Sequence, residues 1–449
     1  MTSRAIVWFR RDLRAVDHRA IAAAAAESSS VVGVFVDDPA LRSVSGVPRL
    51  AALHDRLVEL SRALDGNLVI RRGDPRQVIA ALCDETGAER VFVTRDHAPR
   101  GRQRDGEVAD MLRARSRRLV GVGSNYLVEP GTVRKADGTP YRVFTPFFKA
   151  WLRYLDVETT TPVEVPSVDW RPLASDPMPE RPSLGFELAP ITDDEIAGRW
   201  EMFRTGAIES YTTQRDLPAA DGTSRLSTAL KWGAIHPRTL VAGLDGGLEG
   251  RLAAGDFVSE SQRVFLSELA WRDFYADVLL DRPETAWSNL NPAMDTMVVD
   301  TDRAARERFG RWARAETGFP IVDAAMRQLA ATGWMHNRLR MIVASFLVKD
   351  LHLPWQWGAA HFMAQLSDGD LASNNHGWQW AAGTGTDAAP YFRVFNPWTQ
   401  QKRYDPDGEF VATWVPEAGT DAAIAPMVDH GVERDEALRR YRNVTASRR

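Results

Sequence analysis

The chain has 449 residues, of which 44% are hydrophobic, and its formal net charge at pH 7 is −4. A chain of this length usually divides into two domains, and its single cysteine, Cys83, excludes a disulfide framework and any cluster held by several cysteines. The acidic balance excludes a uniformly basic surface, so any face that binds nucleic acid would be a local patch.

The N-terminal segment MTSRAIVWFRRDL has no apolar core of a secretory signal, and no apolar run in the chain is long enough to span a bilayer. We therefore expect a cytoplasmic protein with no membrane partner. No feature of the sequence calls for an obligate protein partner, and we expect a monomer.

Residues 1–125 alternate short apolar runs with helical patterns. The runs are rich in β-branched residues and occupy 5–9, 31–36, 67–70, 90–94 and 118–123. Strands that alternate with helices pair in parallel and are covered on both faces. We predict an α/β domain with a doubly wound, parallel five-stranded sheet, whose ligand would lie at the carboxyl ends of the strands.

The character of the sequence changes after this domain. Residues 126–195 are rich in turns and prolines, which is typical of a connector that runs over the surface. After 196 the strand patterns disappear and helical periodicity continues almost to the end. We predict an interdomain linker at 126–195 and an all-α domain at 196–449.

One predicted helix, SELAWRDFY, carries Glu268, Trp271, Arg272 and Tyr275 at the spacing of a single face. An ion pair beside an indole would bind a planar polar ligand. Alternatively, the pair would simply pack around a structural tryptophan.

A second predicted helix, HNRLRMIVASFL, carries Asn337, Arg340, Met341 and Ser345 on one side. Polar groups are costly to bury without partners. A bound cofactor would supply those partners, and so would neighbouring backbone.

Hydroxyl groups and a glycine precede the predicted helix STALKWG, in GTSRLS at 222–227. Such groups at a helix N-terminus form a phosphate site, and they also make ordinary helix caps. By contrast, DGD at 368–370 offers too few ligands for a metal loop, and no nucleophile elbow is present. We expect neither a metal site nor hydrolytic chemistry.

The second half of the chain is rich in tryptophan. The whole chain has 15 tryptophans, and DGDLASNNHGWQW at 368–380 places Trp378 and Trp380 beside acids and amides. Buried indole N–H groups need partners. This density favours rings that stack on bases or pass electrons.

Several of these segments follow one another in a characteristic order. VWFRRDLRAVDHRAI precedes YTTQRDLPAADGTSRLS, SELAWRDFY, TGFPIVDAAMRQLAATGWMHNRLRM and DGDLASNNHGWQWAAGTGTDAAPYFRVFNP. The series resembles the class I cyclobutane pyrimidine dimer photolyases of the photolyase/cryptochrome family. The resemblance implies a light-driven DNA repair enzyme, a deoxyribodipyrimidine photo-lyase, which holds FAD in its helical domain and acts on DNA containing cyclobutane pyrimidine dimers.

The resemblance also implies two sets of residues that bind FAD. The set at the diphosphate would comprise Tyr211, Thr223, Ser224, Arg225, Leu226 and Ser227, with Glu268 and Arg272 beside them. The set along the flavin would comprise Asn337, Asp368, Asp370 and Asn374. Asn374 would face N5 of the ring, where an amide favours the fully reduced flavin.

The resemblance also implies residues that bind the DNA lesion and residues that take part in catalysis and electron transfer. The lesion-binding set would comprise Trp271, Asn337, Arg340, Met341, Trp380 and Arg393, with Arg340 near the lesion phosphate. The catalytic set would comprise Glu268, Asn374, Trp378 and Trp355. Within it, Glu268 would bond the bases of the flipped dimer, and Trp378 and Trp355 would begin the electron-transfer chain.

Two features depart from the family pattern. Neither Trp nor Tyr occurs at 288–311, where the third tryptophan of the chain would stand, so Trp287 and Trp357 are candidates for the electron exit. Arg100 and Gly101 replace the Asn-Glu pair of folate-binding members. This weakens methenyltetrahydrofolate as the antenna and leaves 8-hydroxy-5-deazaflavin, another chromophore or none.

The main alternative is a cryptochrome-type blue-light sensor, which Asn374 and the lesion-binding set disfavour. A (6-4) photolyase is disfavoured because Asn337, rather than a second histidine, follows His336. A flavin oxidoreductase without a DNA substrate would not need an exposed aromatic pocket.

Overall fold

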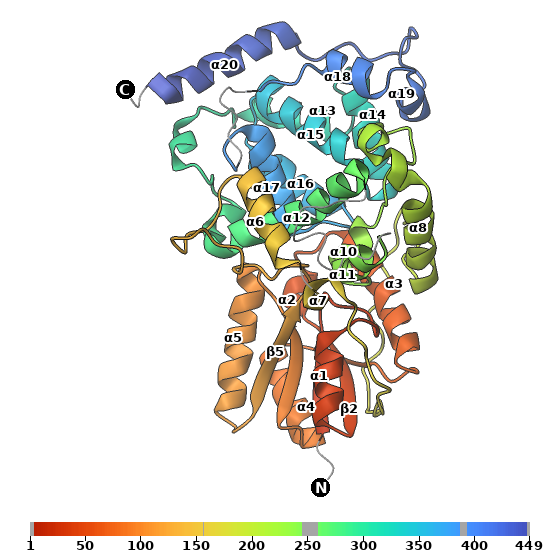
Figure 1. Cartoon of the computed structure of the whole chain (residues 1–449). Coiled ribbons are helices and arrows are strands. Elements are labelled where there is room, and N and C mark those ends of the chain that lie inside the picture. Colours follow the sequence, from red (N-terminus) through yellow and green to blue (C-terminus); the bar gives the residue numbers. More distant parts are fainter. Residues whose placement is uncertain (1–3, 156, 245–258, 387–392, 447–449) are drawn as a thin grey trace.

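The computed structural model describes residues 4–155, 157–244, 259–386 and 393–446. Its sheet, in the lower half of Figure 1, contains β1 (Arg4–Phe9), β2 (Ser30–Asp37), β3 (Val69–Arg72), β4 (Arg90–Arg95) and β5 (Arg118–Ser124). The strands pair in parallel in the order β3-β2-β1-β4-β5. The predicted parallel five-stranded sheet is therefore confirmed. Strand β3 begins later than expected because the backbone N–H of Asn67 bonds Leu64 O within a turn.

Helices cover both faces of this sheet. The helices are α1 (Arg19–Glu27), α2 (Pro39–Arg42), α3 (Val47–Ala63), α4 (Pro75–Thr86) and α5 (Pro99–Arg113). Alternate residues of a strand point to opposite faces, so Ile6 and Trp8 of β1 share a core with α4 and α5. Val7 and Phe9 share the other core with α1 and α3. Burial on both faces explains why the strands are continuously apolar.

The segment that follows β5 runs over the surface but is not wholly irregular. It contains α6 (Phe144–Trp151), η1 (Leu152–Tyr154) and α7 (Val157–Thr160), which the sequence analysis did not anticipate. Helix α6 is strongly apolar and packs onto the helical part of the chain, where Trp151 Nε1 donates to Asp273 Oδ2 (3.0 Å). Farther along, Trp170 forms an isolated bridge with Val31 of β2. The segment thus contacts both parts of the molecule.

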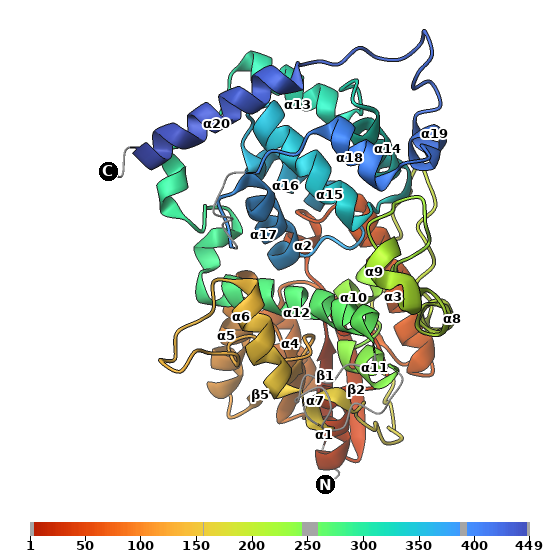
Figure 2. The ribbon, with the colours of Figure 1, turned by 45° about the horizontal axis from the view of Figure 1, so that its top comes forward.

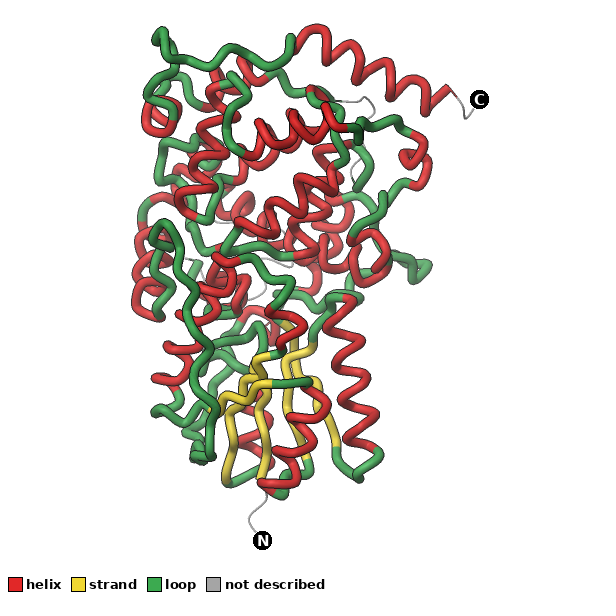
Figure 3. The backbone as a smooth tube through the Cα atoms, turned by 180° about the vertical axis from the view of Figure 1, so that it is seen from behind, coloured by secondary structure: helices red, strands yellow, loops and turns green. Residues whose placement is uncertain are grey.

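The rest of the described chain is helical. It contains α8 (Asp193–Thr205), η2 (Ala207–Ser210), α9 (Tyr211–Gln214), α10 (Ser227–Trp232), α11 (Pro237–Ala242), α12 (Glu260–Asp281), η3 (Pro283–Ala286), η4 (Pro292–Thr296), α13 (Arg303–Ala313), α14 (Pro320–Thr332), α15 (Asn337–Ser345), η5 (Phe346–Asp350), α16 (Trp355–Gln365), α17 (Leu371–Ala382), α18 (Pro397–Tyr404), α19 (Glu409–Trp414) and α20 (His430–Ala446). The predicted all-α second part is confirmed, and Figure 3 shows it stacked above the strands.

Helix α17 lies at the centre of this helical part. It packs against α12, α15 and α16, and Figure 2 shows these helices gathered together. SELAWRDFY lies on α12, most of HNRLRMIVASFL lies on α15 and most of DGDLASNNHGWQW lies on α17, whereas GTSRLS lies ahead of and at the start of α10. Among the described residues, no helix combines the length and the apolar character needed to cross a membrane.

Candidate active site

The packing of these helices leaves a cavity of about 470 Å³. Many of the residues singled out in the sequence line it. They are Tyr211, Ser224, Ser227, Glu268, Trp271, Arg272, Tyr275, Asn337, Arg340, Met341, Asp368, Asp370, Asn374, Trp378 and Trp380. Five predicted site residues, Thr223, Arg225, Leu226, Trp355 and Arg393, are absent from its described lining.

Asp370 lies where α17 begins and faces the cavity. One carboxylate oxygen, Oδ1, caps the helix by accepting from Ala372 N (3.1 Å) and Ser373 N (3.2 Å). The other oxygen, Oδ2, accepts from Arg11 Nη2 (2.5 Å) and lies 3.9 Å from Lys231 Nζ. Burial alone would raise the pKa of Asp370, but Arg11, Lys231 and Arg272 together hold it well below its ordinary value. The cavity therefore contains a permanently ionised carboxylate.

Asn374 lies one turn farther along α17. Its Nδ2 donates to Ala359 O (3.1 Å) and to Asn375 Oδ1 (2.8 Å), so both amide hydrogens are used. The reverse amide orientation would place Asn374 Oδ1 against those two oxygens, so the surroundings determine the assignment. The neighbouring Asn375 is itself held, because its Nδ2 donates to Ala286 O. Asn374 therefore offers an acceptor, Oδ1, to a ligand in the cavity.

Asp368 and Arg340 form an ion pair in the wall of the cavity. Arg340 Nη1 and Nη2 donate to the two oxygens of Asp368, at 3.2 and 2.7 Å, and Arg340 Nε donates to Met335 O (2.8 Å). The Asp368 side chain is only 2% exposed. Such a two-pronged pair is strong and fixed in direction. Arg340 thus has its guanidinium bound to the wall of the cavity.

Glu268 and Arg272, on α12, also have partners. Glu268 Oε1 accepts from Arg215 Nη2 (2.8 Å), a cavity residue that the sequence analysis did not identify. Arg272 donates to Asn125 O (2.6 Å) and Leu230 O (3.2 Å). Its guanidinium lies 4.5 Å from the ring of Tyr126. Glu268 and Arg272 therefore do not pair with each other around Trp271, which was the structural alternative.

Trp271 is held from behind by a residue of the linker. Its ring stacks on that of Phe144, with centroids 3.7 Å apart and planes inclined by 9°. Phe144 is buried in α6. The sequence analysis missed this contact because it treated the segment as a surface connector. Stacking on one side leaves the other face of the indole for the cavity, which Met341 and Trp380 also line.

The loop before α10 has two sides. Ser224 and Ser227 line the main cavity. The N-cap of α10 is Leu226, whose side chain makes no capping bond. Ser227 Oγ accepts from Trp334 Nε1 (3.2 Å), and the Arg225 guanidinium lies 4.9 Å from the Trp334 ring.

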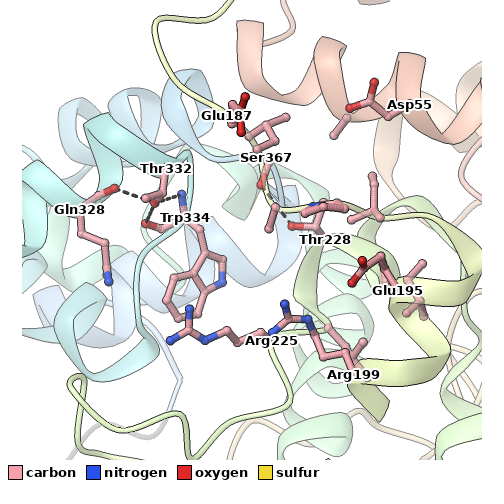
Figure 4. A pocket seen from close by; sticks show the side chains of 18 of the residues that line it. Asp55, Glu187, Glu195, Arg199, Arg225, Thr228, Gln328, Thr332, Trp334 and Ser367 are labelled. Carbon is pink, nitrogen blue, oxygen red and sulfur yellow. Dashed lines mark hydrogen bonds between the residues drawn. The ribbon is translucent and has the colours of Figure 1, made fainter. Parts of the chain in front are cut away.

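Arg225 and Leu226 line a second cavity of about 410 Å³, behind this loop (Figure 4). Both acidic residues and arginines line this cavity, and two of them form ion pairs with residues outside its lining. Asp55 pairs with Arg181 (2.7 Å), and Arg225 pairs with Asp221 (3.0 Å). The wall is nearly balanced in charge and selects neither an anion nor a cation.

Two buried tryptophans lie where α16 and α17 meet. Trp378 belongs to the cavity wall and packs on Gly358, where a Cβ atom would lie 2.1 Å from the indole. Only glycine permits this approach. Trp355 precedes Gly358 by one turn and donates from Nε1 to Asn289 Oδ1 (2.9 Å). Arg393 is exposed and follows residues 387–392, which lie outside the described part of the chain.

The lining of the main cavity fits a flavin nucleotide. Asn374 Oδ1 and the carboxylates of Asp368 and Asp370 are acceptors for ring N–H and ribose hydroxyl groups. The hydroxyls of Ser224 and of Ser227, which accepts from Trp334 and can still donate, suit a diphosphate. Within the described residues, no group of three or more His, Cys, Asp or Glu side chains is placed to hold a metal ion. The fold and the cavity thus define a flavin-binding protein.

Comparison with known proteins specifies the family. Residues 5–167 match the family model described as DNA photolyase, and residues 265–425 match the model described as FAD binding domain of DNA photolyase. Over 92% of the chain, it is 38% identical to the deoxyribodipyrimidine photo-lyase of Salmonella typhimurium, covering 88% of that protein. Over its full length, it is 37% identical to the enzyme of that name from Synechococcus, covering 98% of that protein. The chain belongs to the photolyase/cryptochrome family.

A solved structure supports the same conclusion. A class III photolyase from Agrobacterium tumefaciens superposes with a TM-score of 0.87 at 32% identity, over 99% of this chain and 98% of the other. The family resemblance seen in the sequence motifs is therefore confirmed. The class within the family is not decided by these comparisons, because a class III member is among the similar structures.

Proposed function

We propose that this protein is a deoxyribodipyrimidine photo-lyase, which uses light to split cyclobutane pyrimidine dimers in DNA. The observation that carries the proposal is the composition of the main cavity. Polar residues suited to a flavin and aromatic residues suited to bases share this one cavity. Bound FAD would supply light absorption and the transfer of one electron to the dimer.

The residues along α17 would hold the flavin ring. Asn374 presents an acceptor whose direction is fixed by Ala359 and Asn375, which suits a ring N–H at N5. Asp370 stays ionised, and Asp368 is neutralised by Arg340. We assign Asn337, also in the lining, to the same set.

The loop before α10 would hold the diphosphate. Ser224 and Ser227 would donate hydroxyl groups, and Tyr211 lies in the same lining. The Arg225 side chain contacts Trp334, so Arg225, like Thr223 and Leu226, would contribute through backbone N–H. Glu268 and Arg272 would fix the neighbouring wall of α12.

The flipped dimer would stack between aromatic and apolar side chains at the cavity. Trp271, braced by Phe144, and Trp380 would provide the ring faces, and Met341 would fill between them. We assign the exposed Arg393 to the phosphate contacts. We also assign Arg340 to the lesion phosphate, because its Nη1 and Nη2 each keep a second N–H group after bonding Asp368.

We also propose the domain bounds, the oligomeric state, the cellular location and the class of this enzyme. We divide the chain into a domain at 1–125, a linker at 126–195 and a helical domain at 196–449, supported by the change from strands to helices. We propose a monomer that needs no protein partner and that acts in the cytoplasm. The class I assignment rests on the sequence motifs.

A second chromophore would absorb light for the flavin. The order of the sheet reverses between β1 and β4, where an open sheet usually binds its ligand. Here Arg10 pairs with Asp105 (2.8 Å), and Arg104 pairs with Asp105 (2.7 Å) and Asp96 (3.4 Å). An 8-hydroxy-5-deazaflavin at this crevice would have to fit around these ion pairs. Methenyltetrahydrofolate stays the other candidate.

One experiment tests the function. The purified protein is reduced and illuminated with an oligonucleotide carrying a thymine dimer, while thymine absorbance is followed. Flavin bands with light-dependent recovery are expected. Flavin bands without recovery would favour a blue-light sensor, and a further near-ultraviolet or violet band would identify the antenna.

A further inference from the structure

A row of aromatic rings leads from the main cavity towards the surface. Trp378, in the cavity wall, meets Trp312 of α13 edge to face, with ring centroids 6.1 Å apart. Phe362 contacts both indoles, at 5.1 Å from Trp378 and 6.4 Å from Trp312. All three residues belong to one buried apolar cluster. The two indoles are therefore in direct contact inside the protein.

The row continues outwards from Trp312. His361 and Phe309 lie 5.4 and 5.7 Å from its ring. Phe309 in turn lies 5.6 Å from the ring of Trp357. Trp357 is half-buried, and the exposed Arg306 holds its guanidinium 5.1 Å from that ring. Trp357 is thus the tryptophan of this row that solvent reaches.

The two outer indoles would respond differently to the loss of an electron. Trp312 is fully buried and its Nε1–H donates to Val343 O (3.3 Å), so its proton has no route to water. Oxidised Trp312 would keep its positive charge and readily take an electron from another indole. Trp357 lies at the surface beside a cation that repels a second positive charge. Oxidised Trp357 would therefore release its Nε1 proton to water, which prevents the electron from returning.

We propose that Trp312 and Trp357 complete the electron-transfer chain of this protein, following Trp378. In this route Trp312 takes the second place, which the resemblance gives to Trp355, and Trp357 takes the place of the surface tryptophan missing from 288–311, where this chain has neither Trp nor Tyr. The proposal rests on the flavin-dependent function put forward above. It assigns a role to Trp312, which the sequence analysis passed over, and it selects Trp357 over Trp287 as the exit.

For each photon, Trp378 would give one electron to the flavin, Trp312 would give one to Trp378, and Trp357 would give one to Trp312. Trp357 would then lose its Nε1 proton to water. An external thiol would return one electron to Trp357 and release its own proton to water, which would return a proton to Nε1, and two oxidised thiols would join as a disulfide.

The competing route would run through Trp355 and Trp287. Trp287 is 48% exposed, and its carbonyl oxygen accepts from Gln356 Nε2 (3.2 Å). However, among the ring contacts of the described part of the chain, none involves Trp355 or Trp287. The contact of Trp378 with Trp312 therefore favours the proposed route.

The test compares three variants that each lose one indole. Trp312→Phe and Trp357→Phe interrupt the proposed route, and Trp200→Phe, which removes a similarly buried indole of α8 outside the main cavity, is the matched control. Transient absorption after a blue flash on the oxidised protein follows the tryptophan radical. Steady illumination with a thiol follows flavin reduction. Flavin content and dimer repair by chemically reduced protein show whether each variant is folded and competent.

We expect Trp312→Phe and Trp357→Phe to lose the long-lived radical and the thiol-dependent reduction, while Trp200→Phe keeps both. Trp357→Tyr should restore a long-lived radical with the spectrum of tyrosine. If Trp312→Phe or Trp357→Phe reduces its flavin at the wild-type rate, the route is wrong. Protein that binds no flavin or repairs no dimer would instead overturn the proposed function.

Discussion

Arg11, two residues after the end of β1, donates from Nη2 to Oδ2 of Asp370 (2.5 Å), at the N-terminus of α17. The two residues are 359 positions apart in the chain. Their ion pair joins the carboxyl edge of the sheet to the helix that carries Asn374, Trp378 and Trp380. The sheet domain therefore helps to position the flavin-binding wall.

Arg11→Met should weaken both the fold and flavin binding. Without Arg11, the Asp370 carboxylate keeps Lys231 as a more distant partner. Removing one member of a buried pair costs about 3 to 5 kcal/mol, and partial exposure reduces this to about 2 kcal/mol. The thermal midpoint and the flavin dissociation constant measure the effect. Arg113→Met is the control, because Arg113 and Asp110 are each 74% exposed. Equal midpoints for the two variants would contradict the prediction.

Trp380→Ala should weaken binding of the lesion while sparing the flavin. Stacking of a base on an aromatic ring contributes roughly 1 to 3 kcal/mol. The difference in binding free energy between dimer-containing and undamaged oligonucleotides should therefore shrink by that amount. Trp287→Ala removes an exposed indole outside the cavity and serves as the control. If Trp380→Ala purified without flavin, Trp380 would be a structural residue instead.

DNA binding should depend on salt through a local basic surface. Arg393, Lys402 and Arg403 are exposed, and the last two lie on α18 of the helical part. Each phosphate contact contributes about 0.9 to the slope of log affinity against log salt. Replacing both Lys402 and Arg403 by Gln should reduce that slope by about 2. The same change at Arg113 on α5 should leave it unaltered. A flat salt dependence of the unmodified protein would rule out the basic surface.

Acid should destabilise the protein partly through His376 of α17. Its ring nitrogens bond Ala372 O (2.9 Å) and Thr285 Oγ1 (3.0 Å), and burial lowers its pKa to about 4. The unfolded chain takes up a proton below about pH 6.5, whereas the folded chain does so only near pH 4. The unfolded state binds more protons in this window, so stability falls as the pH falls, by up to about 3 kcal/mol from this residue.

His376→Gln removes that titration and should flatten the pH dependence. Denaturant unfolding of both proteins at several pH values between 7 and 4 measures the difference. The histidines at 336 and 361, whose pKa values are also lowered to about 4 by burial, titrate equally in both proteins. If the difference in unfolding free energy between the two proteins stayed the same from pH 7 to pH 4, His376 would not titrate differently in the folded and unfolded states, and the prediction would be wrong.

The sequence by itself determined the strands of the sheet and the helical character of the second part, and its family resemblance named many of the residues that line the main cavity. Continuous apolar runs identified the strands of the sheet, since burial on both faces leaves no place for polar residues. Helical spacing placed Glu268, Trp271 and Arg272 on one face, and all three line the cavity. These inferences succeed because they depend on periodicity within one element.

Only the tertiary structure decided which partner each of those side chains contacts. Glu268 pairs with Arg215 rather than with Arg272, Phe144 of the linker supports Trp271, and Arg11 reaches Asp370. The contact between Trp312 and Trp378 likewise joins two helices. Local spacing reveals which way a side chain faces, but not which distant segment meets it. That choice depends on how the helices and the sheet pack together, because the partners are brought into contact only when their apolar faces are buried.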